Sequence, residues 1–146
     1  GIDGSRLLLR PPPRSSVAQR KCFAAATVVL ATVGTTATTV LNALRVQTPV
    51  LTVPQDLPRS RVAASVLTAA CVPEFICLSM KDLSRTAVRL CSSPAVLQEA
   101  RRRLLASVTR PSPLFDGRRW AADVWALLRK VLEDADVQRA AAGLEP

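Results

Sequence analysis

Apolar residues recur along this chain with two spacings, and each spacing predicts a type of element. The segment 27–33 (TVVLATV) is a continuous β-branched and aliphatic run, and 50–53 is a shorter run of the same kind. Such runs are typical of strands that are covered on both faces. Apolar positions three and four residues apart predict helices at 36–45, 59–71, 80–91, 94–109 and 117–142.

Three shorter segments complete the pattern. The apolar run 7–9 stops at three consecutive prolines and predicts a brief first strand, 15–25 predicts a short helix, and 75–78 predicts a fourth strand. Strands that alternate with helices predict an α/β protein. We expect a Rossmann-like parallel sheet of about four strands with flanking helices and a helical C-terminus.

The 146 residues are typical of one domain, with three segments inside it. We predict a basic N-terminal segment with the first strand and helix at 1–26, a core at 27–116, and a long amphipathic helix with its tail at 117–146. In the helix 59–71 we expect Val62, Ser65, Val66 and Ala69 to face inward. In the last helix the inward set is Trp120, Val124, Ala126, Leu127, Leu128 and Val131.

Histidine is absent from the sequence, which removes the commonest general base and the commonest neutral metal ligand. Catalysis would have to use carboxylates, thiols or hydroxyls. Cys22, Cys71, Cys77 and Cys91 lack the C-x-x-C spacing of a zinc site. They predict buried free thiols, no metal site and an intracellular, reducing compartment.

Positive charge is abundant and unevenly distributed, with a net charge of +9. No acidic residue occurs between Gly4 and Gln55, and three arginines are consecutive at 101–103. Such a surface attracts polyanions, which include RNA, acidic protein faces and anionic lipid. Biased codon usage and an ordinary solvated face are the alternatives. The candidate contacts are Arg6, Arg10, Arg14, Arg20, Lys21, Arg101, Arg102 and Arg103.

Two further patterns bear on location. No apolar run reaches the roughly 20 residues that span a bilayer, so we do not expect a membrane-spanning protein. An N-terminal region rich in Arg and Ser and nearly free of acid is typical of an organellar protein. The mitochondrial matrix or another organelle is therefore the predicted compartment.

Three motifs resemble the O-GlcNAc transferase family in order and spacing: TPVLTVP at 48–54, SRVAAS at 60–65 and SPLF at 112–115. The resemblance covers the chain from about Ser5 to Val131. It implies the C-terminal lobe of a GT-B glycosyltransferase, which binds the UDP part of UDP-GlcNAc. Within SRVAAS, we expect Arg61 to pair with an acid such as Asp56.

The resemblance assigns nucleotide contacts to three residues that keep some polar character. Thr38 and Thr39 fall on the two threonines that contact the diphosphate, a role suited to hydroxyls at a helix start. Asn42 falls on the ribose-binding aspartate and lacks its charge. The alternative is that Thr38 and Thr39 cap a helix and Asn42 is an ordinary polar helix residue.

Other positions depart from the family pattern. The histidine before the threonines is Ala37, the glycine after them is Val40, and the preceding strand-end aspartate is Ala31. The lysine and histidine of the previous loop fall near Ser16 and Gln19. A charge-assisted contact contributes about 1.5–3 kcal/mol, so losing three or four weakens binding by several powers of ten.

Two functions remain open at this stage. The favoured one is a non-catalytic half-domain that serves as a structural or interaction subunit of a larger assembly, with other protein subunits and RNA as partners. A ribonucleoprotein such as an organellar ribosome suits the charge. In this function we expect the half-domain to have no catalytic residue and no cofactor. The alternative is the UDP-GlcNAc-binding lobe of a protein O-GlcNAc transferase completed by another chain or region.

Overall fold

The structure is a computed structural model in which residues 3–109 and 114–141 are described. The chain divides into two compact units, residues 1–110 and 111–146, and each is treated by itself. The predicted break at 110–113, with the first half of SPLF, lies outside the described residues. The three-segment division predicted from the sequence stays a prediction.

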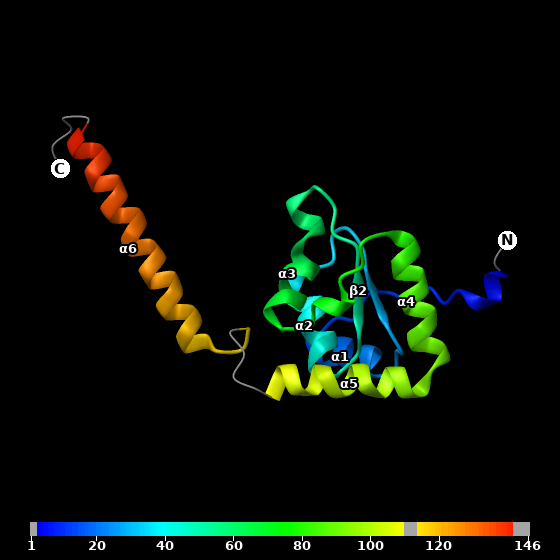
Figure 1. The fold of residues 1–146 in the computed structure, drawn as a ribbon. Helices are drawn as coiled ribbons and strands as arrows, with labels where there is room; N and C mark the ends of the chain where they lie inside the picture. Colours follow the sequence, from blue (N-terminus) through cyan, green and yellow to red (C-terminus); the bar gives the residue numbers. More distant parts are fainter. Residues whose placement is uncertain (1–2, 110–113, 142–146) are drawn as a thin grey trace. The chain divides into compact units, whose positions relative to one another are not determined.

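The first unit alternates helices with short extended segments (Figure 1). Its 3₁₀ turns are η1 Gly4–Arg6, η2 Pro58–Ser60 and η3 Pro73–Phe75, and its strands are β1 Val29–Ala31 and β2 Val50–Thr52. Its helices are α1 Ser16–Ala24, α2 Ala37–Arg45, α3 Val62–Ala69, α4 Met80–Ser92 and α5 Pro94–Thr109. The second unit contains α6 Gly117–Ala141.

The sheet is parallel, as predicted, but smaller. β1 and β2 pair with Val29 opposite Val50 and Ala31 opposite Thr52. A single parallel bridge joins Thr52 to Ile76. Four strands were predicted, and the described residues form two strands and this bridge. The predicted strand at 75–78 is reduced to Ile76 because Pro73 starts a 3₁₀ turn that runs up to Phe75.

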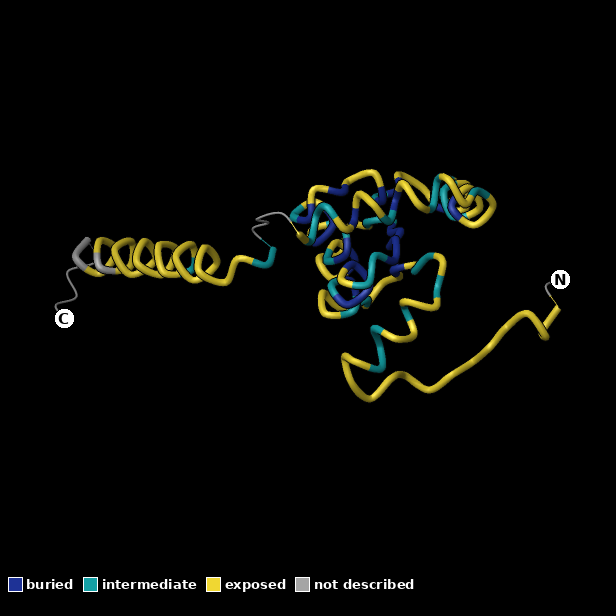
Figure 2. Tube along the Cα trace, turned by 90° about the horizontal axis from the view of Figure 1, so that it is seen from below, coloured by how far each residue is buried: buried dark blue, intermediate teal, exposed yellow. Residues whose placement is uncertain are grey.

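The predicted strand at 7–9 is wrong. Leu7, Leu8 and Leu9 are extended and exposed, Leu9 by 94%, and belong to neither strand of the sheet in the described residues. Three prolines follow at 11–13 and supply no N–H groups that could extend a ladder. Figure 2 shows this whole N-terminal stretch as an exposed trace.

The core is aliphatic and centres on α2 and β2. Val40 and Leu44 of α2, Leu51 of β2, Leu67 of α3 and Leu104 of α5 are fully buried. In Figure 1, α2 and α3 lie on one side of the strands and α4 on the other. Each aliphatic side chain buried in this way stabilises the fold by about 1.5–3 kcal/mol.

The inward face of α3 differs from the prediction. Val66 is buried as predicted, but its buried neighbours are Ala63, Leu67 and Ala70, and Ser65 is exposed. The helix begins at Val62, after the separate turn η2 that starts at Pro58, so its inward positions are shifted from those predicted. The pair of Arg61 with Asp56 is confirmed, at 4.0 Å.

Both α2 and α3 end in a Schellman motif without glycine. After α2, the N–H groups of Gln47 and Thr48 donate to the carbonyls of Leu44 and Ala43 at 2.9 and 3.0 Å. Cys71 and Val72 repeat the pattern after α3. The motif requires a left-handed residue, and Gln47 and Cys71 have φ of 59° and 58°. Glycine would adopt this conformation without strain.

The four cysteines are free thiols, as predicted, but only Cys77 is buried. Cys22, Cys71 and Cys91 are exposed. Cys71 turns outward because it occupies the left-handed position after α3. The prediction of buried thiols was therefore wrong for three of the four.

The helix α6 begins at Gly117 as predicted and is described to Ala141, but it does not have the predicted burial. Trp120, Leu127, Leu128 and Val131 are at least half exposed. In the described part of the second unit, α6 is the one helix, so its apolar side chains have no other helix to pack against within that unit. None of the described helices combines the length and hydropathy of a membrane-spanning segment.

Candidate functional site

The N-terminus of α2 is where the resemblance places the diphosphate. Gly34 turns the chain with φ of 94°, and Thr36 then caps the helix. Its hydroxyl accepts from the N–H of Thr39 at 3.3 Å and lies 3.0 Å from the Thr39 hydroxyl. The alternative prediction, that Thr38 and Thr39 cap the helix, is wrong, because both lie inside α2 and the capping residue is Thr36. Thr38 is exposed.

Asn42 lies one turn further along α2 and is only 4% exposed. Its Nδ2 donates to Oε1 of Gln19 at 2.7 Å, and its Oδ1 accepts from Nη1 of Arg20 at 3.3 Å. Gln19 also donates through Nε2 to the Thr39 hydroxyl at 3.3 Å. Both ends of the Asn42 amide are therefore bonded to α1. We call these four residues and Thr36 the α2 network.

The α2 network has a clear structural role. No residue of α1 is fully buried, so apolar packing alone holds this helix weakly. Hydrogen bonds from Asn42 to two successive residues of α1 fix it on α2. A further bond, from the Thr48 hydroxyl to the Phe23 carbonyl at 2.7 Å, fixes the other end of α1.

The structure thus brings together some of the positions that the resemblance names and separates others. Thr39, Asn42 and Gln19 are joined, whereas Ser16 is exposed at the start of α1. Val40 is fully buried in the core, and Ala31 is buried in β1. No pattern in the sequence indicates that Arg20, predicted as a polyanion contact, bonds to Asn42.

The predicted polyanion contacts fall into two groups. Arg6, Arg10 and Arg14 are exposed on the N-terminal stretch, and Lys21 is exposed on α1. Arg101 is half-buried. The polyanion role of these residues stays a prediction. The N-terminal arginines are the most accessible of the candidate contacts.

The other arginines of the 101–103 cluster are engaged by acids. Arg102 donates to Glu99 at 2.6 Å. Arg103 pairs with Glu74 at 2.8 Å and with Glu99 at 3.4 Å. Two carboxylates therefore offset much of the charge of this pair, which reduces its attraction for a phosphate.

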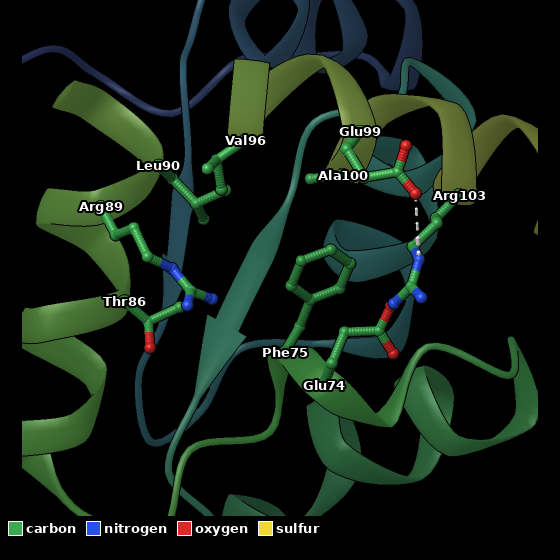
Figure 3. Close-up of a pocket in the computed structure, with 9 residues that line it drawn as sticks. All are labelled: Glu74, Phe75, Thr86, Arg89, Leu90, Val96, Glu99, Ala100 and Arg103. Carbon is green, nitrogen blue, oxygen red and sulfur yellow. Dashed lines mark hydrogen bonds and ion pairs between the residues drawn. The ribbon is translucent and has the colours of Figure 1, made fainter. Parts of the chain in front are cut away.

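A cavity of about 120 Å³ lies beside these ion pairs, between η3, α4 and α5 (Figure 3). Phe75, Leu90, Val96 and Ala100 form its apolar part. The polar part of its lining comprises Glu74, Thr86, Arg89, Glu99 and Arg103. Pockets for drug-sized ligands are roughly 300–1,000 Å³, so this cavity is too small for a sugar nucleotide.

Among the described residues, no group of three or more Cys, Asp or Glu side chains could hold a metal ion. Burial, and then the negative charge of Asp82, raise the pKa of the Cys77 thiol. A raised pKa lowers the thiolate fraction, so Cys77 is a poor nucleophile. Cys77 is therefore not an activated nucleophile.

A search of curated proteins found no match. The family model of glycosyl transferase family 41 matches residues 2–124, which is most of the chain and includes α1, the α2 network, the sheet and α3 to α5. The match agrees with the O-GlcNAc transferase resemblance and with a partial C-terminal lobe of that fold. The chain belongs to glycosyl transferase family 41.

Proposed function

We propose that this chain is a non-catalytic member of its family, in which the nucleotide position has become internal scaffold. The observation that carries the proposal is the burial of Asn42 with both ends of its amide bonded to Gln19 and Arg20. A ribose hydroxyl would have to displace these bonds, each with a net contribution of about 1 kcal/mol. In return, the ribose hydroxyl would contact the neutral amide of Asn42, where the family pattern has a carboxylate.

The phosphate part of the position is weakened in the same way. The Thr39 hydroxyl contacts both Thr36 and Gln19, so a phosphate oxygen would have to compete for it. The nearest replacements for the family histidines are uncharged, Ala37 and Gln19. Without the family histidines, a diphosphate loses charge-assisted contacts, and the cation of the α2 network, Arg20, is already bonded to Asn42.

Calorimetry with UDP and with UDP-GlcNAc tests this part of the proposal. We expect no saturable heat up to about 1 mM ligand, which corresponds to binding weaker than about −4 kcal/mol. Micromolar binding that disappears in the double variant Thr38→Ala/Thr39→Ala, but persists in the control Thr68→Ala, would overturn it. Thr68 is also an exposed helical threonine, and it lies on α3.

The same titration decides the alternative function, a UDP-GlcNAc-binding lobe of a protein O-GlcNAc transferase. Family membership and the exposed Thr38 at the first turn of α2 favour this alternative. It requires another chain or region to supply a general base and a cation. Micromolar UDP affinity would support it, and we propose the non-catalytic role because the α2 network engages Thr39 and Asn42.

For the role itself, we propose a structural subunit of a larger assembly that contains RNA, such as an organellar ribosome. The supporting observation is the exposure of Arg6, Arg10 and Arg14 on a stretch that has no acid from Gly4 to Gln55. Flexible basic side chains on such a stretch release counterions when they bind phosphates, which gives salt-dependent affinity.

Filter binding of single-stranded RNA at several salt concentrations tests the RNA contact. Replacing Arg6, Arg10 and Arg14 by alanine should reduce the slope of log affinity against log salt by about 2. The control variant replaces Arg118, Arg119 and Arg129 by alanine and removes the same charge from α6. Equal losses in both variants would assign the binding to net charge alone and contradict an N-terminal RNA site.

A further inference from the structure

Most of the large apolar residues of α6 gather on one side of the helix, and Val137 lies outside this group. At 3.6 residues per turn they cover an arc of about 160°, from Leu127 at one border to Trp125 at the other. We call this set the apolar face of α6. It comprises Trp120, Val124, Trp125, Leu127, Leu128, Val131 and Leu132, and all except Val124 are at least half exposed.

The charges of α6 are unevenly distributed along its length. Arg118 and Arg119 lie in the first turn, where the helix dipole disfavours cations. Within α6, Arg119 pairs with Asp123 at 3.8 Å. Glu133 and Asp134 lie in the C-terminal half. Arg129 and Lys130 precede these acids and Arg139 follows them, so the acidic part of α6 is the segment 133–136. This segment and the basic first turn face each other only when two helices run in opposite directions.

We propose that the α6 helices of two copies of this chain pair in antiparallel orientation through their apolar faces. When the two-fold axis passes beside Ala126, each residue lies opposite the residue of the other copy whose number is 252 minus its own. Trp120 then lies opposite Leu132, Val124 opposite Leu128, and Arg118 opposite Asp134. In a parallel pair, Arg118 would lie beside Arg118 of the other copy. This inference is independent of the function proposed above.

The available area suits a weak, reversible dimer. Trp120 and Trp125 are each 64% exposed and together offer on the order of 300 Å² per copy, given up to about 250 Å² per indole. The four exposed aliphatic residues add on the order of 200 Å². Two copies then bury on the order of 1,000 Å², the lower limit for a specific interface.

Sedimentation equilibrium of the full chain at physiological salt tests the dimer. We expect a monomer–dimer equilibrium with a dissociation constant on the order of 10 µM, as suits an interface of this size. Leu128→Glu introduces a charge at the centre of the apolar face and should weaken association at least about 100-fold. Ala122→Glu introduces the same residue on the opposite side and should leave association unchanged.

Tryptophan fluorescence separates pairing between copies from packing within one chain. The sequence has two Trp and no Tyr, so the emission reports on α6 alone. Upon dilution through the dissociation constant, the emission maximum should shift to the red. A blue emission that does not change with concentration, in a monomeric chain, would show that α6 packs within its own chain and would overturn the proposal.

A charge exchange tests the orientation. Arg118→Glu should weaken the dimer about tenfold, because it places two acids opposite each other, and Asp134→Arg added to it should restore the affinity. Failure of the second change to restore the affinity would contradict the antiparallel arrangement. A dimer that persists unweakened in Leu128→Glu would contradict the apolar face as its interface.

Discussion

The helices α2 and α6 were predicted from the same spacing of apolar residues, yet they have opposite surroundings. Leu44 of α2 is fully buried, whereas Leu127 and Leu132 of α6 are more than 60% exposed. The difference arises because strands and helices of the first unit cover α2, while α6 is the one helix described in its unit. Periodicity identifies an apolar face, and only the tertiary partners determine whether that face is buried.

The largest contrast should appear in thiol chemistry. Cys77 lies in the buried part of the first unit, so it reacts with a thiol reagent only when that part opens. We expect its rate at pH 8 to be at least about 10³-fold below that of Cys91, because opening costs about 4 kcal/mol or more. Its raised pKa lowers the rate further. Mass spectrometry of the labelled peptides measures both rates.

The exposed Cys22 and Cys71 serve as internal references in the same sample. If Cys77 were modified as quickly as these two, the first unit would open readily. The contrast between a buried core and an exposed α6 would then be much smaller than the structure indicates.

The same substitution in both regions gives the next largest effect. Leu67→Ala removes a fully buried side chain from α3 and should reduce the free energy of unfolding by about 3 kcal/mol. Leu127→Ala on α6 should reduce it by less than about 0.5 kcal/mol. Urea unfolding followed by circular dichroism at low micromolar concentration, where α6 is unpaired, measures both. A large effect of Leu127→Ala would indicate that α6 packs against the folded chain.

The α2 network offers a polar version of this comparison. Asn42→Ala removes the partner of the Arg20 guanidinium and of Oε1 of Gln19 on α2, and it should cost about 2 kcal/mol of unfolding free energy. Thr38→Ala alters an exposed neighbour on the same helix and should cost less than about 0.5 kcal/mol. Equal costs in the two variants would mean that the network does not anchor α1.

Smaller gains are expected at the ends of α2 and α3. Gln47→Gly and Cys71→Gly relieve left-handed strain and should each raise the free energy of unfolding by about 1 kcal/mol. Ser65→Gly, in the interior of α3, should instead lower it by about 0.5 kcal/mol. Thermal and urea unfolding measure these shifts. A loss of stability in Cys71→Gly would show that its side chain contributes contacts that outweigh the strain.

Local signals allowed much of the fold to be predicted. The helix 94–109 was predicted with both of its ends, because Pro94 and the break after Thr109 mark them in the sequence. The strand 27–33 was predicted too long, since only Val29–Ala31 finds a partner. The number of strands was overestimated because the runs 7–9 and 75–78 resemble strands, whereas 7–9 pairs with neither strand and only Ile76 of the second run bridges to β2.

The candidate site was less predictable because its key contacts join distant parts of the chain. The resemblance identified Thr39 and Asn42, and it placed Gln19 nearby. That Gln19 and Asn42 bond to each other across 23 positions depends on how α1 lies on α2, which no local pattern encodes. The role of Arg20 was missed for the same reason.

The attachment of α1 has a consequence for local opening. This helix has no fully buried residue and is joined to its neighbours by a few polar bonds, so it can separate from α2 while the aliphatic core stays intact. Separation would free Thr39 and Asn42 in one step and leave the start of α2 accessible to solvent. Fast amide hydrogen exchange in α1, together with slow exchange in α2, would indicate this local opening.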